Sequence, residues 1–211
     1  MPFARIDRAG WPFVGGAIAV ALVAGAAFGW VGALPFAILA AFFLLFFRDP
    51  ERQAPPSNNA VVAPADGRVL VAGPAGADAA PAGAWTQVSI FLSPLDVHVN
   101  RIPASGRVTR VVYTRGRFLP AYHPRAAAAY ERSEIWIDHD GQTIVSRQVV
   151  GVLARRVVCR VQSGAQVQAG DRYGIMKFGS RMDVFLPTAA ELCVKVGDGV
   201  RGGETIIAVL H

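Results

Sequence analysis

A run of 39 residues without a charged side chain, from Ala9 to Phe47, constrains this chain more than any other feature. As one continuous helix the run would be about 58 Å long, at 1.5 Å per residue. About 20 residues suffice to cross the hydrocarbon core of a bilayer, so two short spans fit better than one. The run therefore predicts a membrane-associated hydrophobic helical hairpin over residues 1–50. Its break is expected near Gly29–Gly32 and Pro35, where helix-weakening residues cluster.

Arginines flank the uncharged run on both sides. Arg5 and Arg8 precede it, and Arg48 and Arg52 follow it. A hairpin brings both flanks to one side of the membrane, and the positive-inside rule predicts that this side is cytoplasmic. Two alternatives stay open: a cleaved secretory signal, whose apolar region is typically about 7–15 residues, and a hairpin that enters one leaflet without crossing. The polar, Pro-rich stretch 51–60 is expected to be a linker.

The composition favours an anionic partner. The formal net charge is +6, although charged residues make up only 17% of the chain and apolar residues 53%. A basic balance of this kind suits a membrane surface or a phosphorylated substrate. Nucleic acid is not expected, because the sequence has no basic stripe interleaved with aromatic residues and no known nucleic-acid motif. The expected location is the cytoplasmic face of the cell membrane, and the oligomeric state is left open, a homo-oligomer included.

From residue 61 to residue 211, short alternating runs recur between glycine-rich turns. Runs of about four to eight residues that are rich in β-branched side chains are typical of strands. Asp140–Gly141 separates two such runs and predicts a hairpin turn. Residues 124–130 are a short helical candidate, with an ordered loop as the alternative. The expected fold is therefore mainly β, a small β-sandwich or barrel that follows the hydrophobic helical hairpin.

Two segments of this β part resemble each other. They are APADGRVLVAG at residues 63–73 and VKVGDGVRGGETIIAV at residues 194–209, and the second is similar to the closing half of biotinyl/lipoyl-type domains. Met176–Lys177 also resembles the acceptor site of such domains. One hypothesis is therefore a membrane-anchored biotinyl-type carrier or adaptor domain modified at Lys177. The Phe-Gly-Ser sequence that follows Lys177 is unlike an acceptor site, and this hypothesis leaves residues 61–160 without a role.

Gly179–Ser180 supports a second hypothesis. A serine hydroxyl in a constrained turn can attack the carbonyl of a preceding glycine, which has no Cβ to shield it. The acyl group then moves from nitrogen to oxygen, and elimination frees the Gly179 carboxylate and leaves dehydroalanine. Hydrolysis converts that residue into a pyruvoyl group. A Gly-Ser pair is common in turns, so this interpretation depends on its context in the sequence.

Four segments supply that context, and together they resemble the short-form phosphatidylserine decarboxylase proenzymes. They are PADG at 64–67, FLSPLDVHVNRIP at 91–103, GRFLPAYHPRAAAAYER at 116–132 and KFGSRMDVFLP at 177–187. The resemblance extends from about residue 48 to the C-terminus. It is specific, because FLSPxDVHxNR is followed downstream by FGSRMD.

The resemblance implies that the domain at 61–211 cuts itself after Gly179. Residues 1–179 would form the β chain and residues 180–211 the α chain, with a pyruvoyl cofactor made from Ser180. The pyruvoyl carbonyl would form a Schiff base with the amine of phosphatidylserine in the membrane and act as an electron sink for decarboxylation. The product would be phosphatidylethanolamine, and no metal would be needed. A pyruvoyl decarboxylase for a soluble amino acid is a further alternative, which the uncharged N-terminal run disfavours.

The resemblance also implies catalytic roles. His98 is expected to transfer protons, because imidazole titrates near neutral pH. Asp66 is expected to support the base that assists Ser180, or else to close a turn. If residues 96–98 form a strand, Asp96 and His98 share a face; the alternative for Asp96 is a turn at the end of a strand.

Two further residues are implied as substrate-binding. Larger relatives have a second histidine at the position of Arg101, and an arginine cannot act as a base at pH 7. The base for self-cleavage therefore stays open among His98, Asp66 and Asp96. Arg101 is instead expected to bind the substrate carboxylate or phosphate through its fork of donors. His123, in the third resembling segment, is expected to line the site.

Overall fold

The computed structural model describes residues 5–76, 80–116, 131–150, 157–177 and 180–211. The helical candidate at residues 124–130 lies outside these residues. The chain divides into two units, Met1–Glu51 and Arg52–His211, each with its own internal contacts.

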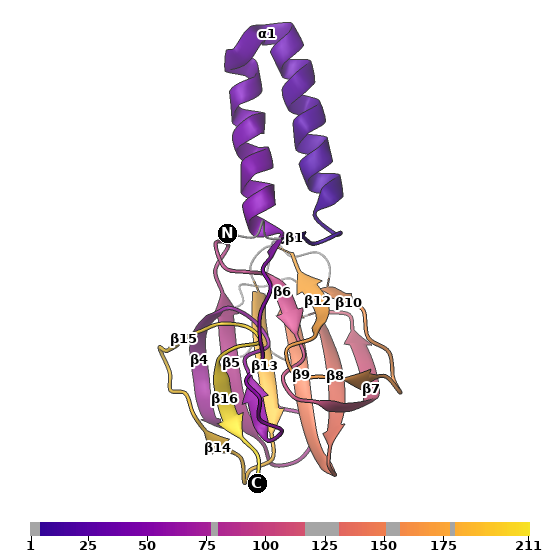
Figure 1. Cartoon of the computed structure of the whole chain (residues 1–211), viewed down its shortest axis with the longest axis vertical. Helices are drawn as coiled ribbons and strands as arrows, with labels where there is room; N and C mark the ends of the chain where they lie inside the picture. The colour runs from indigo at the N-terminus through magenta and orange to yellow at the C-terminus, as the bar shows by residue number, and fades with distance from the viewer. Residues whose placement is uncertain (1–4, 77–79, 117–130, 151–156, 178–179) are drawn as a thin grey trace. The chain divides into compact units, whose positions relative to one another are not determined.

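The first unit is a helical hairpin, as predicted. Its helix α1 (Trp11–Phe46) is interrupted at Gly29, whose φ of 69° and ψ of −168° are not helical, and Figure 1 shows the two resulting legs. Glycine adopts this positive φ without a steric penalty, so the break falls there although Pro35 is also inside the helix. The short strands β1 (Arg5–Ile6) and β2 (Arg48–Asp49) pair antiparallel and bring the two ends of the hairpin together.

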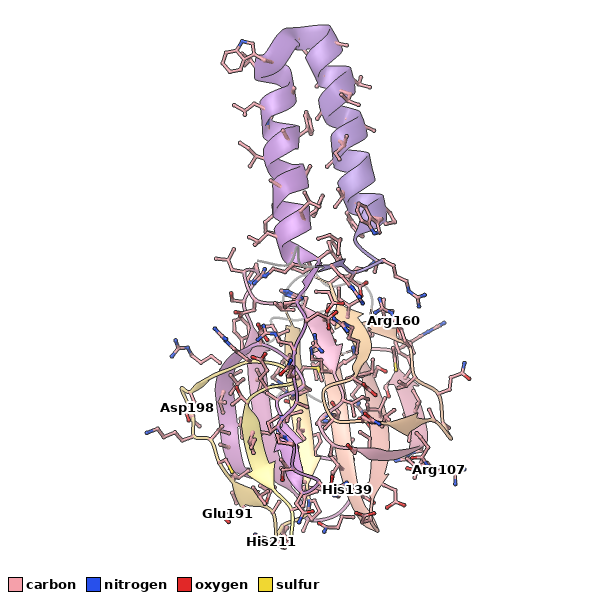
Figure 2. The ribbon with its side chains drawn as sticks, viewed as in Figure 1. Arg107, His139, Arg160, Glu191, Asp198 and His211 are labelled. Atoms are coloured by element: carbon pink, nitrogen blue, oxygen red, sulfur yellow. The ribbon has the colours of Figure 1, made fainter. Side chains whose placement is uncertain are left out.

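The side chains of α1 are unsuited to water. Phe28 and Trp30, beside the bend, are 76% and 77% exposed, and Figure 2 shows apolar side chains projecting along both legs. Burial of apolar surface is worth about 25 cal/mol per Å², so this exposure is costly in an aqueous setting. The helix is long and apolar enough to cross a membrane, which is consistent with membrane association.

The second unit is built from short strands. In order they are β3 (Ala60–Val62), β4 (Gly67–Pro74), β5 (Thr86–Leu92), β6 (Val99–Arg101), β7 (Gly106–Thr114), β8 (Arg132–His139), β9 (Gln142–Val150), β10 (Val157–Cys159), β11 (Gln166–Val167), β12 (Arg172–Met176), β13 (Ser180–Leu186), β14 (Glu191–Leu192), β15 (Gly199–Val200) and β16 (Ile206–Val209). The largest sheet has the order β11-β7-β8-β9-β13-β5-β4-β15. Two three-stranded sheets, β10-β12-β6 and β14-β16-β3, contribute to the same hydrophobic core (Figure 1). The expectation of a mainly β sandwich or barrel is confirmed.

Strand alternation places this core. On β5 and β13 every second residue is fully buried in it, namely Val88, Ile90, Leu92, Met182, Val184 and Leu186. Side chains alternate between the two faces of a strand, so the residues between them lie on the opposite face of the sheet. The predicted hairpin turn joins β8 to β9, and both of its residues have positive φ, 50° at Asp140 and 83° at Gly141. These values suit a two-residue hairpin turn, which requires φ above zero at both central positions.

The second of the two segments that resemble each other in sequence pairs with the first segment and with the strand just before it. β16 pairs with β3, and β15 pairs with β4, so residues near the C-terminus complete the sheet edges formed by residues 60–68. The residues of PADG therefore lie next to the segment that contains Gly199–Val200. If the chain is cut after residue 179, these pairings hold the two pieces together.

Gly67 of PADG occupies a position that excludes a side chain. Its φ is 151°, and a Cβ added there would overlap the carbonyl oxygen of Phe91. We expect Gly67→Ala to lower the free energy of unfolding by about 3 kcal/mol, since strained backbone alone costs about 1–3 kcal/mol. Gly73 is the matched control, because it lies on the same strand with a φ of 153° and open space around its Cα. Thermal unfolding of the detergent-solubilised chain should show a clearly larger loss for Gly67→Ala; equal losses would contradict the steric argument.

Candidate active site

Ser180 begins the central strand β13. In the sheet register, its backbone lies opposite Leu92 of β5 on one side and Val150 of β9 on the other. Gly179 and His123 lie outside the described residues, and for Ser180 the structure describes the backbone. Both neighbours of β13 are paired with it over most of its length, so the register of these pairs defines the position of Ser180 along the sheet.

Two connections between the same pair of sheets concern His98 and Ser180. The loop from β5 to β6 starts after Leu92, opposite Ser180, and ends at His98, whose carbonyl oxygen accepts the Met176 N–H at 3.3 Å. The loop from β12 to β13 starts after Met176 and ends at Ser180. The two loops therefore join the same pair of sheets. Met176 and Ser180 are four residues apart, which limits their Cα separation to about 14 Å.

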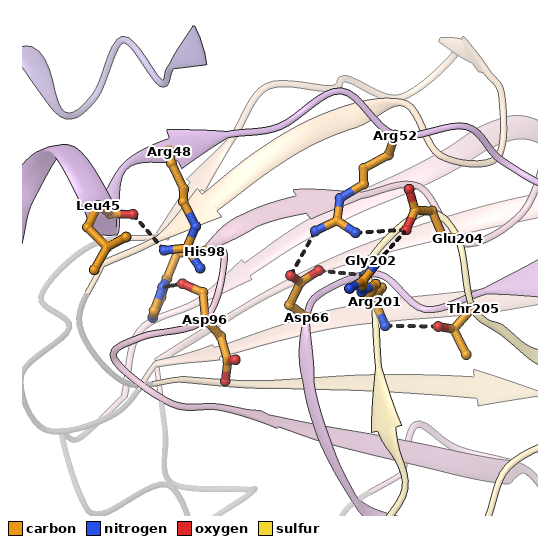
Figure 3. Close-up of polar contacts among 10 residues, drawn as sticks. All are labelled: Leu45, Arg48, Arg52, Asp66, Asp96, His98, Arg201, Gly202, Glu204 and Thr205. Atoms are coloured by element: carbon orange, nitrogen blue, oxygen red, sulfur yellow. Dashed lines mark hydrogen bonds and ion pairs between the residues drawn. The ribbon is translucent and has the colours of Figure 1, made fainter. Parts of the chain in front are cut away.

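His98 is fully buried and held in one tautomer. Its Nδ1–H donates to the backbone carbonyl of Asp96 at 3.0 Å, and a carbonyl can only accept (Figure 3). In the neutral ring the basic lone pair is therefore on Nε2. A histidine oriented in this way can take up or release a proton at Nε2.

Asp96 lies in a turn, so the expectation that residues 96–98 form a strand with a shared face is wrong, and the turn alternative is confirmed. Its carboxylate Oδ2 accepts the Ser93 N–H at 2.7 Å, and its own N–H donates to the Ser93 carbonyl at 2.9 Å. Ser and Pro at the start of this segment favour such a turn, since Pro presets the backbone and an Asp side chain bonds nearby N–H groups. Asp96 thus orients His98 through its backbone carbonyl. It also lines a cavity of about 440 Å³ together with Gly67, Arg68, Phe91, Ser93 and Gly199.

Asp66 is held by two partners from distant parts of the chain. Its Oδ1 accepts the Gly202 N–H at 2.8 Å, and its Oδ2 pairs with an Arg52 nitrogen at 3.0 Å (Figure 3). A second Arg52 nitrogen pairs with Glu204 at 2.8 Å. Asp66 therefore bonds a backbone N–H that is 136 residues away, and not a nearby N–H of a local turn as the turn interpretation expected.

Arg101 is also inside the fold. It is 3% exposed, and its Nη1 donates to the carbonyl of Gly170 at 2.9 Å. Gly203 lies directly against its side chain, where a Cβ would come within 2.7 Å of Cδ. This glycine makes room for the Arg101 side chain.

Arg52 and Glu204 were not identified from the sequence. Arg52 was counted only as a flank of the hydrophobic hairpin, and its partners Asp66 and Glu204 are 14 and 152 residues away. No local pattern marks such a contact. Among the described residues, no cluster of three or more His, Cys, Asp or Glu has a metal-binding arrangement.

A mainly β unit with the buried His98, in a chain that also has an apolar helical hairpin, is consistent with the resemblance to decarboxylase proenzymes. The model of the family described as phosphatidylserine decarboxylase matches residues 39–208. The chain is 42% identical to the phosphatidylserine decarboxylase proenzyme of Nitrosomonas europaea, over 100% of this chain and 97% of that protein. It is 40% identical to those of Neisseria gonorrhoeae and Aromatoleum aromaticum, over 99% of this chain and 80% and 97% of the relatives. The chain belongs to the phosphatidylserine decarboxylase family, which confirms the resemblance.

Proposed function

We propose that this chain is a membrane-associated proenzyme that cuts itself between Gly179 and Ser180. The processed enzyme then converts phosphatidylserine into phosphatidylethanolamine and CO₂. The observation that supports the proposal, given the family, is that Met176, four residues before Ser180, donates its N–H to the carbonyl of the buried His98. The alternative of a carrier modified at Lys177 is not favoured, because the chain belongs to a family of decarboxylases.

Self-cleavage starts when the Ser180 hydroxyl attacks the Gly179 carbonyl. A C–O bond forms, the Gly179–Ser180 C–N bond breaks, and the result is an ester. A base then removes the Ser180 Cα proton, the Cβ–O bond breaks, and the Gly179 carboxylate leaves. Water hydrolyses the remaining dehydroalanine and releases ammonia, so the only co-reactant is water.

Among the three residues left open as the base, the contacts favour His98. The carboxylate of Asp66 is engaged by Arg52 and Gly202, and that of Asp96 by the Ser93 N–H. His98 has its donor nitrogen fixed on a carbonyl, so the lone pair on Nε2 is the group suited to accept a proton. Asp66 is then a residue that positions the segment around Gly202, and the buried Arg101 has a structural role in place of the expected contact with substrate.

The residues present suit a pyruvoyl group at position 180. Such a group, once formed, supplies an electron sink that makes loss of CO₂ from the bound substrate feasible. β13 is paired on both sides from Ser180 onward, so the new chain end stays in the sheet after the cut. His98, six residues along the chain from Leu92, the β5 residue opposite Ser180, would return the proton to the carbon that loses CO₂.

The hydrophobic hairpin fits a lipid substrate. Each CH₂ group that leaves the membrane for water costs about 0.8 kcal/mol, so a diacyl lipid does not dissociate readily. The enzyme must therefore work at the membrane, and the apolar α1 provides the attachment. We place the β unit on the cytoplasmic face, because the arginines that flank the run favour that side and each adds about 1 kcal/mol toward anionic lipid.

The intact mass of the purified full-length protein, combined with an assay on vesicles that contain phosphatidylserine, tests this proposal. We expect two chains split after Gly179, a smaller chain that carries a pyruvoyl group at residue 180, and release of CO₂ with formation of phosphatidylethanolamine. A single chain with a biotin-sized adduct on Lys177 would instead establish the carrier. Decarboxylation of soluble amino acids, but not of the lipid, would establish the third alternative.

A further inference from the structure

Arg181, directly after Ser180, forms a buried ion pair on its own strand. Its Nε lies 2.9 Å from Asp183 Oδ1, and its Nη2 donates to Asp183 Oδ2 at 3.0 Å. Arg181 is 7% exposed and Asp183 is fully buried. Both lie on the face of β13 opposite the core residues Met182 and Val184, as strand alternation requires.

The pair is connected to the neighbouring strand β5. Ser89 lies opposite Asp183 in the register, and its Oγ donates to Asp183 Oδ1 at 2.6 Å. Gln87 Nε2 in turn donates to Ser89 Oγ at 2.8 Å. We call Gln87, Ser89, Arg181 and Asp183 the β5–β13 polar network. All four are buried, and the network ties the first residues of β13 to the strand that leads into the His98 loop.

Stability alone does not explain this network. A buried ion pair loses about as much through desolvation as it gains from attraction, and apolar residues of similar size serve stability as well or better. What a buried polar network can add is a defined register, because a slip by one residue would place Asp183 on the core face. Register matters most here, since β13 starts at the residue that reacts.

We propose that the β5–β13 polar network is the positioning device for residue 180, and that Arg181 and Asp183 are positioning residues of the reaction. This inference rests on the proposed function. Before the cut, the chain holds Ser180 from both sides; after the cut, residue 180 is a chain end, and chain ends fray unless they are tied down. The network holds Arg181, the residue after 180. It thereby keeps residue 180 opposite Leu92, after which the loop to His98 starts.

The test compares two isosteric changes of a buried carboxylate to an amide. Asp183→Asn weakens the network. Glu134→Gln is the matched control, because Glu134 is 7% exposed and Arg147 Nε donates to it at 2.8 Å on the same sheet, but on β8, two strands from β13. Arg147 lies opposite Asp183 on β9; burial lowers the pKa of its guanidinium, and Glu134 and Asp183 both oppose that effect. Glu134→Gln therefore changes the charge beside the network but none of the network's own hydrogen bonds. Each variant is made in the full chain, and its processing rate, thermal midpoint and kcat and KM on phosphatidylserine vesicles are measured.

We expect Asp183→Asn to lower the processing rate and the kcat of its processed fraction by about tenfold or more, because a misplacement of the reacting group by about 1 Å costs up to about 10²-fold in rate. KM should change less than about twofold. Glu134→Gln should lower the thermal midpoint to a similar extent but leave processing and kcat within about twofold. Equal kinetic losses in the two variants, or none in Asp183→Asn, would overturn the proposal.

Two milder variants cover a failure of Asp183→Asn to fold. Ser89→Ala keeps the ion pair and removes only its hydrogen bond to β5. Arg181→Lys keeps the positive charge but loses the bidentate contact with the Asp183 carboxylate. We expect both to fold and to lower kcat by a smaller factor than Asp183→Asn, at unchanged KM; wild-type kcat in both would overturn the proposal. If the wild-type chain itself is not cut after Gly179, the proposed function has failed, and that result is distinct from a failure of the network.

Discussion

The Ser180→Ala variant is expected to stay a single chain of 211 residues and to have no decarboxylase activity. Alanine has no hydroxyl to attack the Gly179 carbonyl, so neither the ester nor the new chain end can form. Without the electron sink, catalysis should fall below detection, a loss of at least about 10⁴-fold given that enzymes accelerate reactions by about 10⁶-fold or more. A denaturing gel, the intact mass and a phosphatidylserine vesicle assay measure the three quantities on one preparation.

Ser163→Ala is the control for this variant. Ser163 is exposed, lies in a turn and is followed by glycine rather than preceded by it. This control should be cut and active like the wild type. Cleavage of Ser180→Ala at the same bond would contradict the proposal, because it would mean that a protease or another nucleophile makes the cut.

His98→Gln is expected to lower kcat on phosphatidylserine by about 10²–10⁴-fold, the usual contribution of a general acid–base group. Glutamine can keep a hydrogen bond to the Asp96 carbonyl but cannot move a proton. KM should change little, because the fully buried imidazole is proposed to act on protons rather than to bind the lipid. The measurement is steady-state kinetics on the processed fraction, with the processing rate followed separately.

His139→Gln is the matched control. His139 is 6% exposed, and its Nδ1–H donates to the Ser105 carbonyl at 2.7 Å, so it repeats the local setting of His98. His139 lies opposite Gln142, beside the β8–β9 turn (Figure 2). Val150, which lies opposite Ser180, is eight residues further along β9, so His139 is about 27 Å along the strands from the level of Ser180. We expect wild-type activity for this control.

The two readouts for His98→Gln separate its proposed roles. Slow processing together with low kcat would assign both proton transfers to His98. Normal processing with low kcat would leave decarboxylation to His98 and return self-cleavage to Asp66 or Asp96. Normal values of both would contradict the assignment of His98.

The features that sequence analysis predicted correctly depend on short-range chemistry. The hairpin follows from an uncharged run too long for one span, and its break falls at Gly29 because glycine accepts a positive φ. The β8–β9 turn follows from Asp140–Gly141 in the same way. Of the two alternatives for Asp96, a strand that continues to His98 or a turn, the turn is observed, because Ser93 and Asp96 bond each other locally.

The sequence by itself determined the apolar hairpin, the β character of the remaining chain and, through its motifs, the family. The proposal that the Gly179–Ser180 pair reacts also comes from the sequence. Only the tertiary structure decided which distant groups meet: the partners of Asp66 and the buried network beside Ser180. The physical reason is range. Turn chemistry and strand alternation act between near neighbours in the chain, whereas Arg52 and Glu204, or Ser89 and Asp183, are joined only when the sheets assemble.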